Sequence, residues 1–374
     1  MGSMAFWYEK SSSAHTDELT PRAVMNFNLW TQCSSQLKPW DIIRKNKSPR
    51  SNPQSFLDIG FIIYNITAAK KLYYYIPFKV SISNAEISDL SKQIQSSKTI
   101  GAIFNETLSV IDEPGSRYFW PVKDASISEN PLKFVLYQWD DDSVVTVNSA
   151  LSDEGTCLEI DVEKFKNKIA SAVHAGMSIS EKDPYYFRFR VNIPSPSQNN
   201  TIVRRYKPPN NFLQSTLITT YIIDFRLNDT RSLSNKINDQ IKHPNNALVD
   251  ISKLHFLLMT KAHIDVETGE KNISLRELES NTWDDYIDHK FEIKDIVAFH
   301  CSEKPKDGKT LVSAQWEFFA KLKCNNSTFR VIFTYFIALL IITIILDGIS
   351  GFFWKSAVPF IKQLWSSLCG LLPH

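Results

Sequence analysis

A short segment near the middle of the chain alternates aromatic and arginine side chains: residues 185–190 read YYFRFR. Successive side chains of a β-strand point to opposite faces of the sheet, so the two phenylalanines would face the core while Tyr186, Arg188 and Arg190 project together. Arginine beside an aromatic ring suits phosphate contacts and base stacking on a single-stranded oligonucleotide or a small nucleotide. We therefore predict that Tyr186, Arg188 and Arg190 bind a ligand.

A second basic group, Arg204, Arg205, Tyr206 and Lys207, lies in a stretch rich in proline and asparagine. We assign Arg204, Arg205 and Lys207 to the same predicted ligand site. The alternative for both groups is a solvated strand face and a basic loop, with the arginines paired to Asp or Glu.

Signatures of known enzyme classes do not occur in the sequence: it lacks GxSxG, HExxH, a P-loop and GxGxxG. The eight histidines are scattered, and the five cysteines are widely spaced without a CxxC pair. This pattern predicts a protein that is not an enzyme, holds no metal and no cofactor, and has no disulfide framework. The cysteine usage fits a reducing compartment.

Composition and charge are those of an ordinary globular protein, with 43% hydrophobic and 22% charged residues among 374 and a net charge of +2. That balance excludes a globally basic nucleic-acid-binding protein and leaves only local basic sites. The chain is long enough for one large or two medium domains.

The elements that would position these residues are mostly strands, because short runs rich in β-branched and aromatic residues recur between turn signals. We expect an irregular arm over 4–55, a β-rich domain over 56–193, and a second β-rich domain, or a continuation of the first, over 194–328. Strands are predicted at 57–64, 71–78, 134–139, 157–162, 185–193, 217–226, 254–259, 296–301 and 311–323, and helices at 87–94, 162–175 and 233–241.

The strongest signal is a run of sixteen uncharged residues, Val331–Leu346, which reads VIFTYFIALLIITIIL. It covers about 24 Å as a helix, against a hydrocarbon core of about 30 Å, so a membrane-spanning helix would extend over 329–354. A buried core helix is the alternative. The predicted fold class is therefore α+β: a β-rich soluble region with a C-terminal transmembrane helix and a short amphipathic helix over 355–374.

Asp347 would have either of two roles in such a helix. Inside the bilayer it would share one face with Thr343 and Gly351 and line a polar path in a homo-oligomer. Otherwise it marks the helix end. Trp354 and Trp365 suit headgroup depth at the membrane interface.

The charges flanking this run favour a single-pass protein of a bacterial inner membrane with a cytoplasmic soluble region, because three basic residues precede the run and two follow it. The abundance of Asn, Ile and Lys suggests an AT-rich bacterial gene.

This layout, with a basic strand at Arg188 and Arg190 and a hydrophobic helix over Val331–Trp354, resembles bacterial antiphage membrane effectors of the Hailong type. The resemblance implies an oligomeric ion channel in the lipid bilayer that an oligonucleotide, made by a companion nucleotidyltransferase, holds in check. The alternative is a passive membrane-anchored binding or scaffold module without gating.

Overall fold

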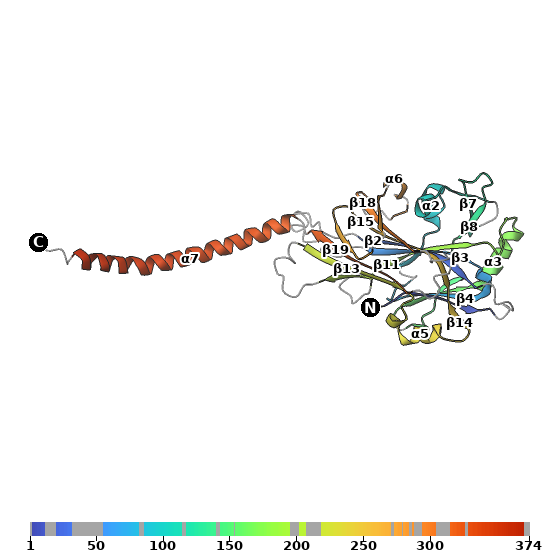
Figure 1. Cartoon of the computed structure of the whole chain (residues 1–374), viewed down its shortest axis with the longest axis horizontal. Coiled ribbons are helices and arrows are strands. Elements are labelled where there is room, and N and C mark those ends of the chain that lie inside the picture. Colours follow the sequence, from blue (N-terminus) through green and yellow to red (C-terminus); the bar gives the residue numbers. More distant parts are fainter. Residues whose placement is uncertain are drawn as a thin grey trace. The chain divides into compact units, whose positions relative to one another are not determined.

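The structure is a computed structural model that describes residues 2–11, 20–31, 55–81, 86–113, 117–139, 143–152, 154–194, 202–206, 218–270, 273–278, 280–283, 286–287, 294–303, 315–325 and 328–369. The chain divides into two compact units. The first comprises residues 1–34, 50–206 and 220–324 and holds nearly all of the strands (Figure 1). The second comprises residues 35–49, 207–219 and 325–374.

A ten-stranded sheet forms the centre of the first unit, in the order β17-β18-β15-β2-β3-β11-β8-β7-β6, with β5 also paired to β11. Neighbours are antiparallel except β15 with β2 and β11 with β8. The strands are β2 (Arg22–Thr31), β3 (Ser55–Tyr64), β5 (Ile87–Asp89), β6 (Leu108–Val110), β7 (Phe119–Asp124), β8 (Leu132–Tyr137), β11 (Tyr185–Ile193), β15 (Asp250–Lys261), β17 (Ile273–Glu277) and β18 (Ile296–Glu303).

Two smaller sheets complete the first unit. A five-stranded sheet has the order β14-β1-β4-β10-β9, and a four-stranded sheet has the order β12-β13-β19-β16. A bridge between Met4 and Leu227 links the start of β1 to β13. The strands are β1 (Ala5–Lys10), β4 (Ala69–Ile76), β9 (Val145–Val147), β10 (Thr156–Asp161), β12 (Val203–Tyr206), β13 (Ile218–Leu227), β14 (Asn246–Leu248), β16 (Asp265–Thr268) and β19 (Trp316–Asn325).

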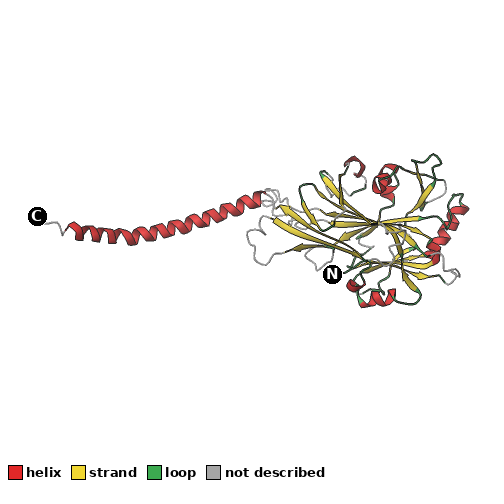
Figure 2. Cartoon of the chain, viewed as in Figure 1, coloured by secondary structure: helices red, strands yellow, loops and turns green. Residues whose placement is uncertain are grey.

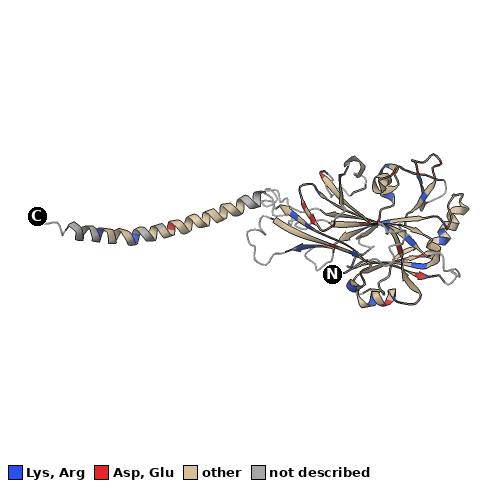
Figure 3. Ribbon diagram, in the orientation of Figure 1, with Lys and Arg blue, Asp and Glu red and all other residues tan. Residues whose placement is uncertain are grey.

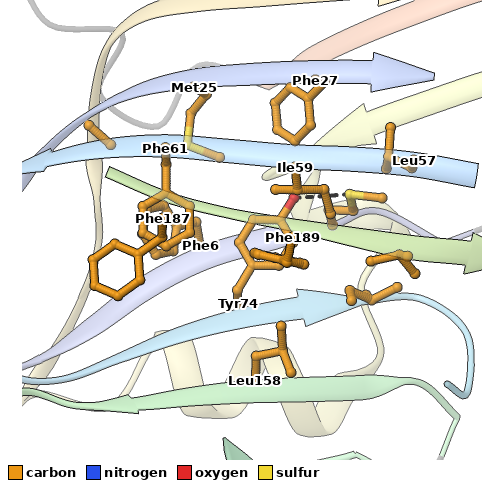
Figure 4. Packing of buried hydrophobic residues seen from close by; sticks show 14 of the residues in the cluster. Phe6, Met25, Phe27, Leu57, Ile59, Phe61, Tyr74, Leu158, Phe187 and Phe189 are labelled. Carbon is orange, nitrogen blue, oxygen red and sulfur yellow. Dashed lines mark hydrogen bonds between the residues drawn. The ribbon is translucent and has the colours of Figure 1, made fainter. Parts of the chain in front are cut away.

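The main hydrophobic core lies between the ten-stranded sheet and the two smaller ones (Figure 4). Phe61 of β3 stacks on Phe187 of β11 and contacts Phe6 of β1, with ring centroids 5.1 and 4.9 Å apart. Phe27 of β2 contacts Phe225 of β13 at 4.8 Å. Each such buried ring contributes roughly 1.5–3 kcal/mol relative to an exposed one, so these contacts hold the sheets face to face.

Helices cover the outer surfaces of the sheets (Figure 2). A second core lies on the outward face of the ten-stranded sheet, beneath α2 and the side chains of Trp283, Tyr286 and Ile287, and a third lies between the five-stranded sheet and α5. The helices are α2 (Ser97–Phe104), α3 (Val162–His174), α5 (Asn235–Ile241) and α6 (Ser280–Trp283), with 3-10 turns at Ile66–Ala68, Lys92–Ile94 and Thr230–Ser232. Around β3 and β11 the ten-stranded sheet is therefore covered on both faces.

Side-chain caps fix where the helices begin. Asp161 accepts a hydrogen bond from the Lys164 amide at 3.1 Å at the start of α3, and Ser96 does the same for Thr99 at the start of α2. Gly176, with a φ of 98°, follows α3 where a C-terminal glycine is expected.

Two predictions about the elements differ from the structure. The stretch 4–55, expected to be an irregular arm, contains β1 and β2, and both strands are almost fully buried. Residues 87–94 form a short strand and a 3-10 turn instead of a helix. The main core takes residues from both sides of position 194, which corresponds to the alternative in which residues 194–328 continue the first β-rich domain.

The cysteines also depart from expectation at one position. Cys324, near the end of β19, is disulfide-bonded, whereas Cys157 and Cys301 are free. Burial raises the pKa of the Cys301 thiol to about 11, so this thiol stays protonated at neutral pH.

The described part of the second unit is essentially α7, Thr328–Cys369, a helix of 42 residues with Pro359 in its interior. It runs without interruption through Gly348 and Gly351, so residues 355–369 continue the same helix. The separate amphipathic helix predicted over 355–374 is therefore not formed.

Across the residues that the structure describes, α7 included, no helix is long and apolar enough to cross a membrane. This finding contradicts the transmembrane helix predicted at 329–354, and with it the membrane-anchored fold class and the single-pass inner-membrane localisation. The physical reason is length: the uncharged run 331–346 spans about 24 Å, less than the roughly 30 Å of a hydrocarbon core, and Asp347 ends it.

Candidate ligand-binding face

The predicted arginine strand is β11, and its three candidate side chains lie inside the protein. Tyr186 and Arg188 are fully buried, and Arg190 is 9% exposed. The alternation predicted from the sequence is present, because Phe187 and Phe189 face the main core while Tyr186, Arg188 and Arg190 face the other way. That other face is covered by the second core, so it meets protein instead of solvent.

A buried arginine cluster, made of Asp58, Tyr186, Arg188, Arg190 and Tyr286, results from this arrangement. Arg190 donates to both carboxylate oxygens of Asp58 at 2.7 and 3.1 Å. Arg188 donates from Nε to the Tyr286 hydroxyl at 2.7 Å and from Nη1 to the Tyr186 hydroxyl at 2.8 Å. Tyr286 in turn donates to Asp58 at 2.7 Å.

The charged groups of this cluster are stabilised by one another and by the two tyrosine hydroxyls instead of by solvent. Burial alone would lower the pKa of Arg188, but Tyr186, Tyr286 and Asp58 raise it overall, so the guanidinium stays charged. Burial raises the pKa of Tyr286 well above its ordinary value, so this phenol stays a proton donor to Asp58. In the described structure these side chains satisfy one another, which is the arrangement of a structural ion pair.

Gly60 makes room for the cluster. It lies on β3 directly opposite Arg188. A Cβ atom at this position would lie 2.4 Å from the Tyr186 hydroxyl and 3.0 Å from Arg188 Nη1. The absence of a side chain there therefore lets Tyr186 and Arg188 lie across β3.

The second predicted group behaves differently. Arg204, Arg205 and Tyr206 form the exposed end of β12, the first strand in the four-stranded sheet, while Lys207 lies outside the described residues. Tyr206 is 48% exposed. Arg204 pairs with Ile222 and Tyr206 with Thr220 of β13, so Arg204 and Tyr206 share one face.

The outward face of the four-stranded sheet carries more of the same chemistry. Along β19, Trp316 and Phe318 point into the main core, so Glu317, Phe319, Lys321 and Lys323 point outward. Phe319 is 43% exposed, and Lys321 is exposed as well. We call Arg204, Tyr206, Phe319 and Lys321 the exposed sheet face.

Acidic side chains also lie on this outward face, and two of them are paired. Glu267 of β16 forms an ion pair with Lys323, and Asp224 of β13 accepts from Arg226 at 2.9 Å. Glu317 lies on the same face of β19, four residues before Lys321, and Glu267 of β16 is the residue opposite Lys321. An anion on this sheet would therefore be favoured toward Arg204 and disfavoured toward Glu317.

The remaining predicted residues lie on α7. Thr343, Asp347, Gly351, Trp354 and Trp365 are all exposed, and the Thr343 hydroxyl donates to the Leu339 carbonyl at 2.9 Å. The helix carries few charged residues (Figure 3). The polar path predicted along this face required a membrane-spanning helix, which the described residues do not form.

Sequence reasoning missed four residues that matter here: Asp58, Gly60, Phe319 and Lys321. One signal was available for Asp58, because it is the only charged residue in the apolar run LDIGFIIY. A signal was also available for Phe319, because it is an apolar residue on the face of β19 that otherwise carries Glu317, Lys321 and Lys323. Among side chains that the structure describes, no group of three or more His, Cys, Asp or Glu could hold a metal ion.

Comparisons with known proteins assign no family. No family model matches the chain, and no curated protein matches it. Among solved structures, the Mu homology domain of Fcho1 from Danio rerio, with a bound Eps15 peptide, is similar over 82% of this chain and 81% of its own. The identity is 8% and the TM-score 0.16, so this likeness carries no argument.

Proposed function

We propose that the protein is a binding module that holds a single-stranded oligonucleotide against the exposed sheet face. The observation that carries the proposal is the exposure of Arg204, Tyr206, Phe319 and Lys321 on one side of one sheet. Neighbouring strands lie about 4.8 Å apart, so β12 and β19 are separated by roughly 10 Å across β13.

The aromatic side chains support this ligand class. An exposed ring on a rigid strand offers a stacking surface for a base, and such a contact contributes about 1–3 kcal/mol per base without demanding a particular sequence. Tyr206 and Phe319 meet that description. Both are large aromatic side chains left in solvent by a fold that buries most of its rings.

The positively charged side chains of the exposed sheet face support a ligand with a phosphate backbone. Arg204 and Lys321 would contact phosphate groups, Arg204 through its planar guanidinium and Lys321 as a point charge. The buried arginine cluster has no part in this proposal, because its donors already bond to Asp58 and the two tyrosines. The channel expected from the sequence depended on the transmembrane helix and is not proposed.

The test is fluorescence polarisation of a labelled single-stranded oligonucleotide of mixed sequence with the full chain. Tyr206→Ala is expected to weaken binding by about 5- to 100-fold, the equivalent of losing one stacked base. Arg204→Glu is expected to weaken it at least tenfold and to reduce the salt dependence by roughly one contact.

Lys242→Glu is the matched control, because Lys242 is exposed at the end of α5, on the five-stranded sheet, and the charge change is the same. Binding that Arg204→Glu and Lys242→Glu weaken equally would reduce the effect to net charge and contradict the proposal. An absence of binding by the unaltered chain would leave a scaffold role instead.

A further inference from the structure

Helix α7 presents apolar side chains to solvent along much of its 42 residues. Ile344 is 62% exposed and Trp365 71% exposed, and no described residue of α7 belongs to the three hydrophobic cores. An apolar helix surface of this extent is stable in water once another apolar surface covers it. The charges and the residue spacing along α7 indicate which surface that is.

Only three charged residues occur between positions 331 and 369, and two of them are placed symmetrically. Asp347 and Lys355 stand four residues before and four residues after Gly351, and Lys362 is the third. All three charged side chains are exposed. At 3.6 residues per turn, Asp347 and Lys355 lie within about 40° of Gly351 around the helix axis. A twofold axis through Gly351 would therefore set Asp347 of each copy beside Lys355 of the other.

Two glycines lie at the same level of the helix. Gly348 and Gly351 are exposed, and a Cβ atom at either position would meet nothing within 4 Å. Glycine lowers the stability of a helix, because it loses more backbone freedom on folding than any other residue. Packing among the described residues gives no reason for glycine at these two positions, whereas a second helix could approach their backbone closely.

Apolar side chains continue this side of the helix in both directions from Gly351. Positions alternately three and four residues apart share one side of a helix, as they do along the seam of a coiled coil. The residues that follow this spacing form what we call the α7 pairing face. It comprises Ile337, Leu340, Ile344, Asp347, Gly351, Lys355, Val358, Lys362 and Trp365.

The α7 pairing face is complementary to itself when two copies run antiparallel. Ile344 of one copy then faces Val358 of the other. Leu340 faces Lys362, whose methylene stem covers the leucine while its ammonium group stays in water. In a parallel pair each residue would face its own counterpart, which would set Asp347 against Asp347 and oppose association.

We propose that a second copy of this chain docks on the α7 pairing face, antiparallel to the first, with the two helices crossing at Gly351. Each pair of helices contains two Asp347–Lys355 contacts, one on either side of the crossing. The interface is made by α7 alone and does not depend on oligonucleotide binding by the exposed sheet face.

Exchanging the two charges tests this register. Sedimentation equilibrium of the full chain in detergent-free buffer gives the dissociation constant of the pair. Asp347→Lys and Lys355→Asp are each expected to weaken association at least about tenfold, because each sets like charges together. The double variant restores both contacts with the signs exchanged, so its affinity should return to within about threefold of the unaltered chain. Gln363→Lys, exposed on another side of α7, is the control and should change the affinity less than about twofold.

Cysteine cross-linking tests the orientation with the natural charges in place. Ile344→Cys and Val358→Cys chains, each also carrying Cys369→Ser, would be mixed and mildly oxidised. We expect a disulfide between the two kinds of chain. Ile344→Cys alone should form none with its own copy, because fourteen residues along the axis separate the two thiols by about 21 Å, too far for a disulfide.

Three results would overturn the proposal. The first is a full chain that is monomeric at every concentration measured. The second is a double charge variant that associates as weakly as either single variant. The third is an Ile344→Cys chain that links to its own copy, which would show a parallel pair.

Discussion

Asp58 accepts four hydrogen bonds from three side chains, those of Arg190, Tyr286 and Trp30, and none of its surface is exposed. Replacing it by alanine would leave Arg190 charged and unpaired in the interior. We expect Asp58→Ala to lower the free energy of unfolding by about 3–5 kcal/mol, measured by urea denaturation. Glu9→Ala is the control. Glu9 pairs with Lys70 at a distance of 2.7 Å, but the Lys70 side chain is 58% exposed, and such a surface pair contributes at most about 1 kcal/mol.

Equal losses for Asp58→Ala and Glu9→Ala would contradict a structural role for the cluster.

The sequence could not have predicted the burial of Arg188 and Arg190. Alternation assigns them correctly to one face of β11, but what covers that face includes Tyr286, nearly a hundred residues later in the chain. By contrast, β12 ends in three exposed residues, so Arg204 and Arg205 could be placed in solvent from their polar surroundings.

At the scale of elements, the strands that the sequence predicts well are those with apolar runs bounded by turns. β11, predicted at 185–193, forms at those residues. β18, predicted at 296–301, begins at the predicted residue and is two residues longer, ending at Glu303. β2 was missed because Asn26 and Asn28 interrupt its apolar pattern. Those two asparagines lie on the outward face of the sheet, where Asn26 pairs with His255 of β15 and Asn28 with Asp58 of β3. β2 is paired on one side with β15, and a neighbour so distant in sequence cannot be recognised from the local pattern of residues.

The close approach of β11 side chains to β3 gives a prediction about glycine. Gly60→Ala would place a methyl group against Tyr186 and Arg188, so we expect a loss of about 1–3 kcal/mol of stability in urea denaturation. Gly269→Ala is the matched control, since a Cβ there meets nothing within 4 Å. A Gly60→Ala variant as stable as Gly269→Ala would show that the cluster can shift without cost.

The whole molecule joins a well-packed unit to an exposed apolar helix. All three hydrophobic cores end by Cys324, so no described residue of α7 contributes to them. Along α7, by contrast, Leu339 is 62% exposed and Trp354 70% exposed. Contiguous apolar surface of this kind drives association in water.

A chain ending at Asn325 is therefore expected to fold as the full chain does and to remain monomeric. Its melting temperature should stay within about 2 °C of the full chain's, a shift that corresponds to roughly 1 kcal/mol in a protein of this size. The full chain is expected to associate in detergent-free buffer at the same protein concentration, as measured by light scattering. Loss of folding in the shortened chain, or a monomeric full chain, would contradict this division.

The pairing of β2 with β15 has a consequence during synthesis on the ribosome. Asp250, at the start of β15, comes 219 residues after Thr31, at the end of β2. At a translation rate of about 5–20 residues per second, β2 waits roughly 10–45 seconds for this neighbour. During that time β2 can pair with β3, but its other edge stays open, with Met25, Phe27 and Leu29 still to be buried. The apolar edge of β2 therefore stays unpaired in the nascent chain until β15, Asp250–Lys261, has been synthesised.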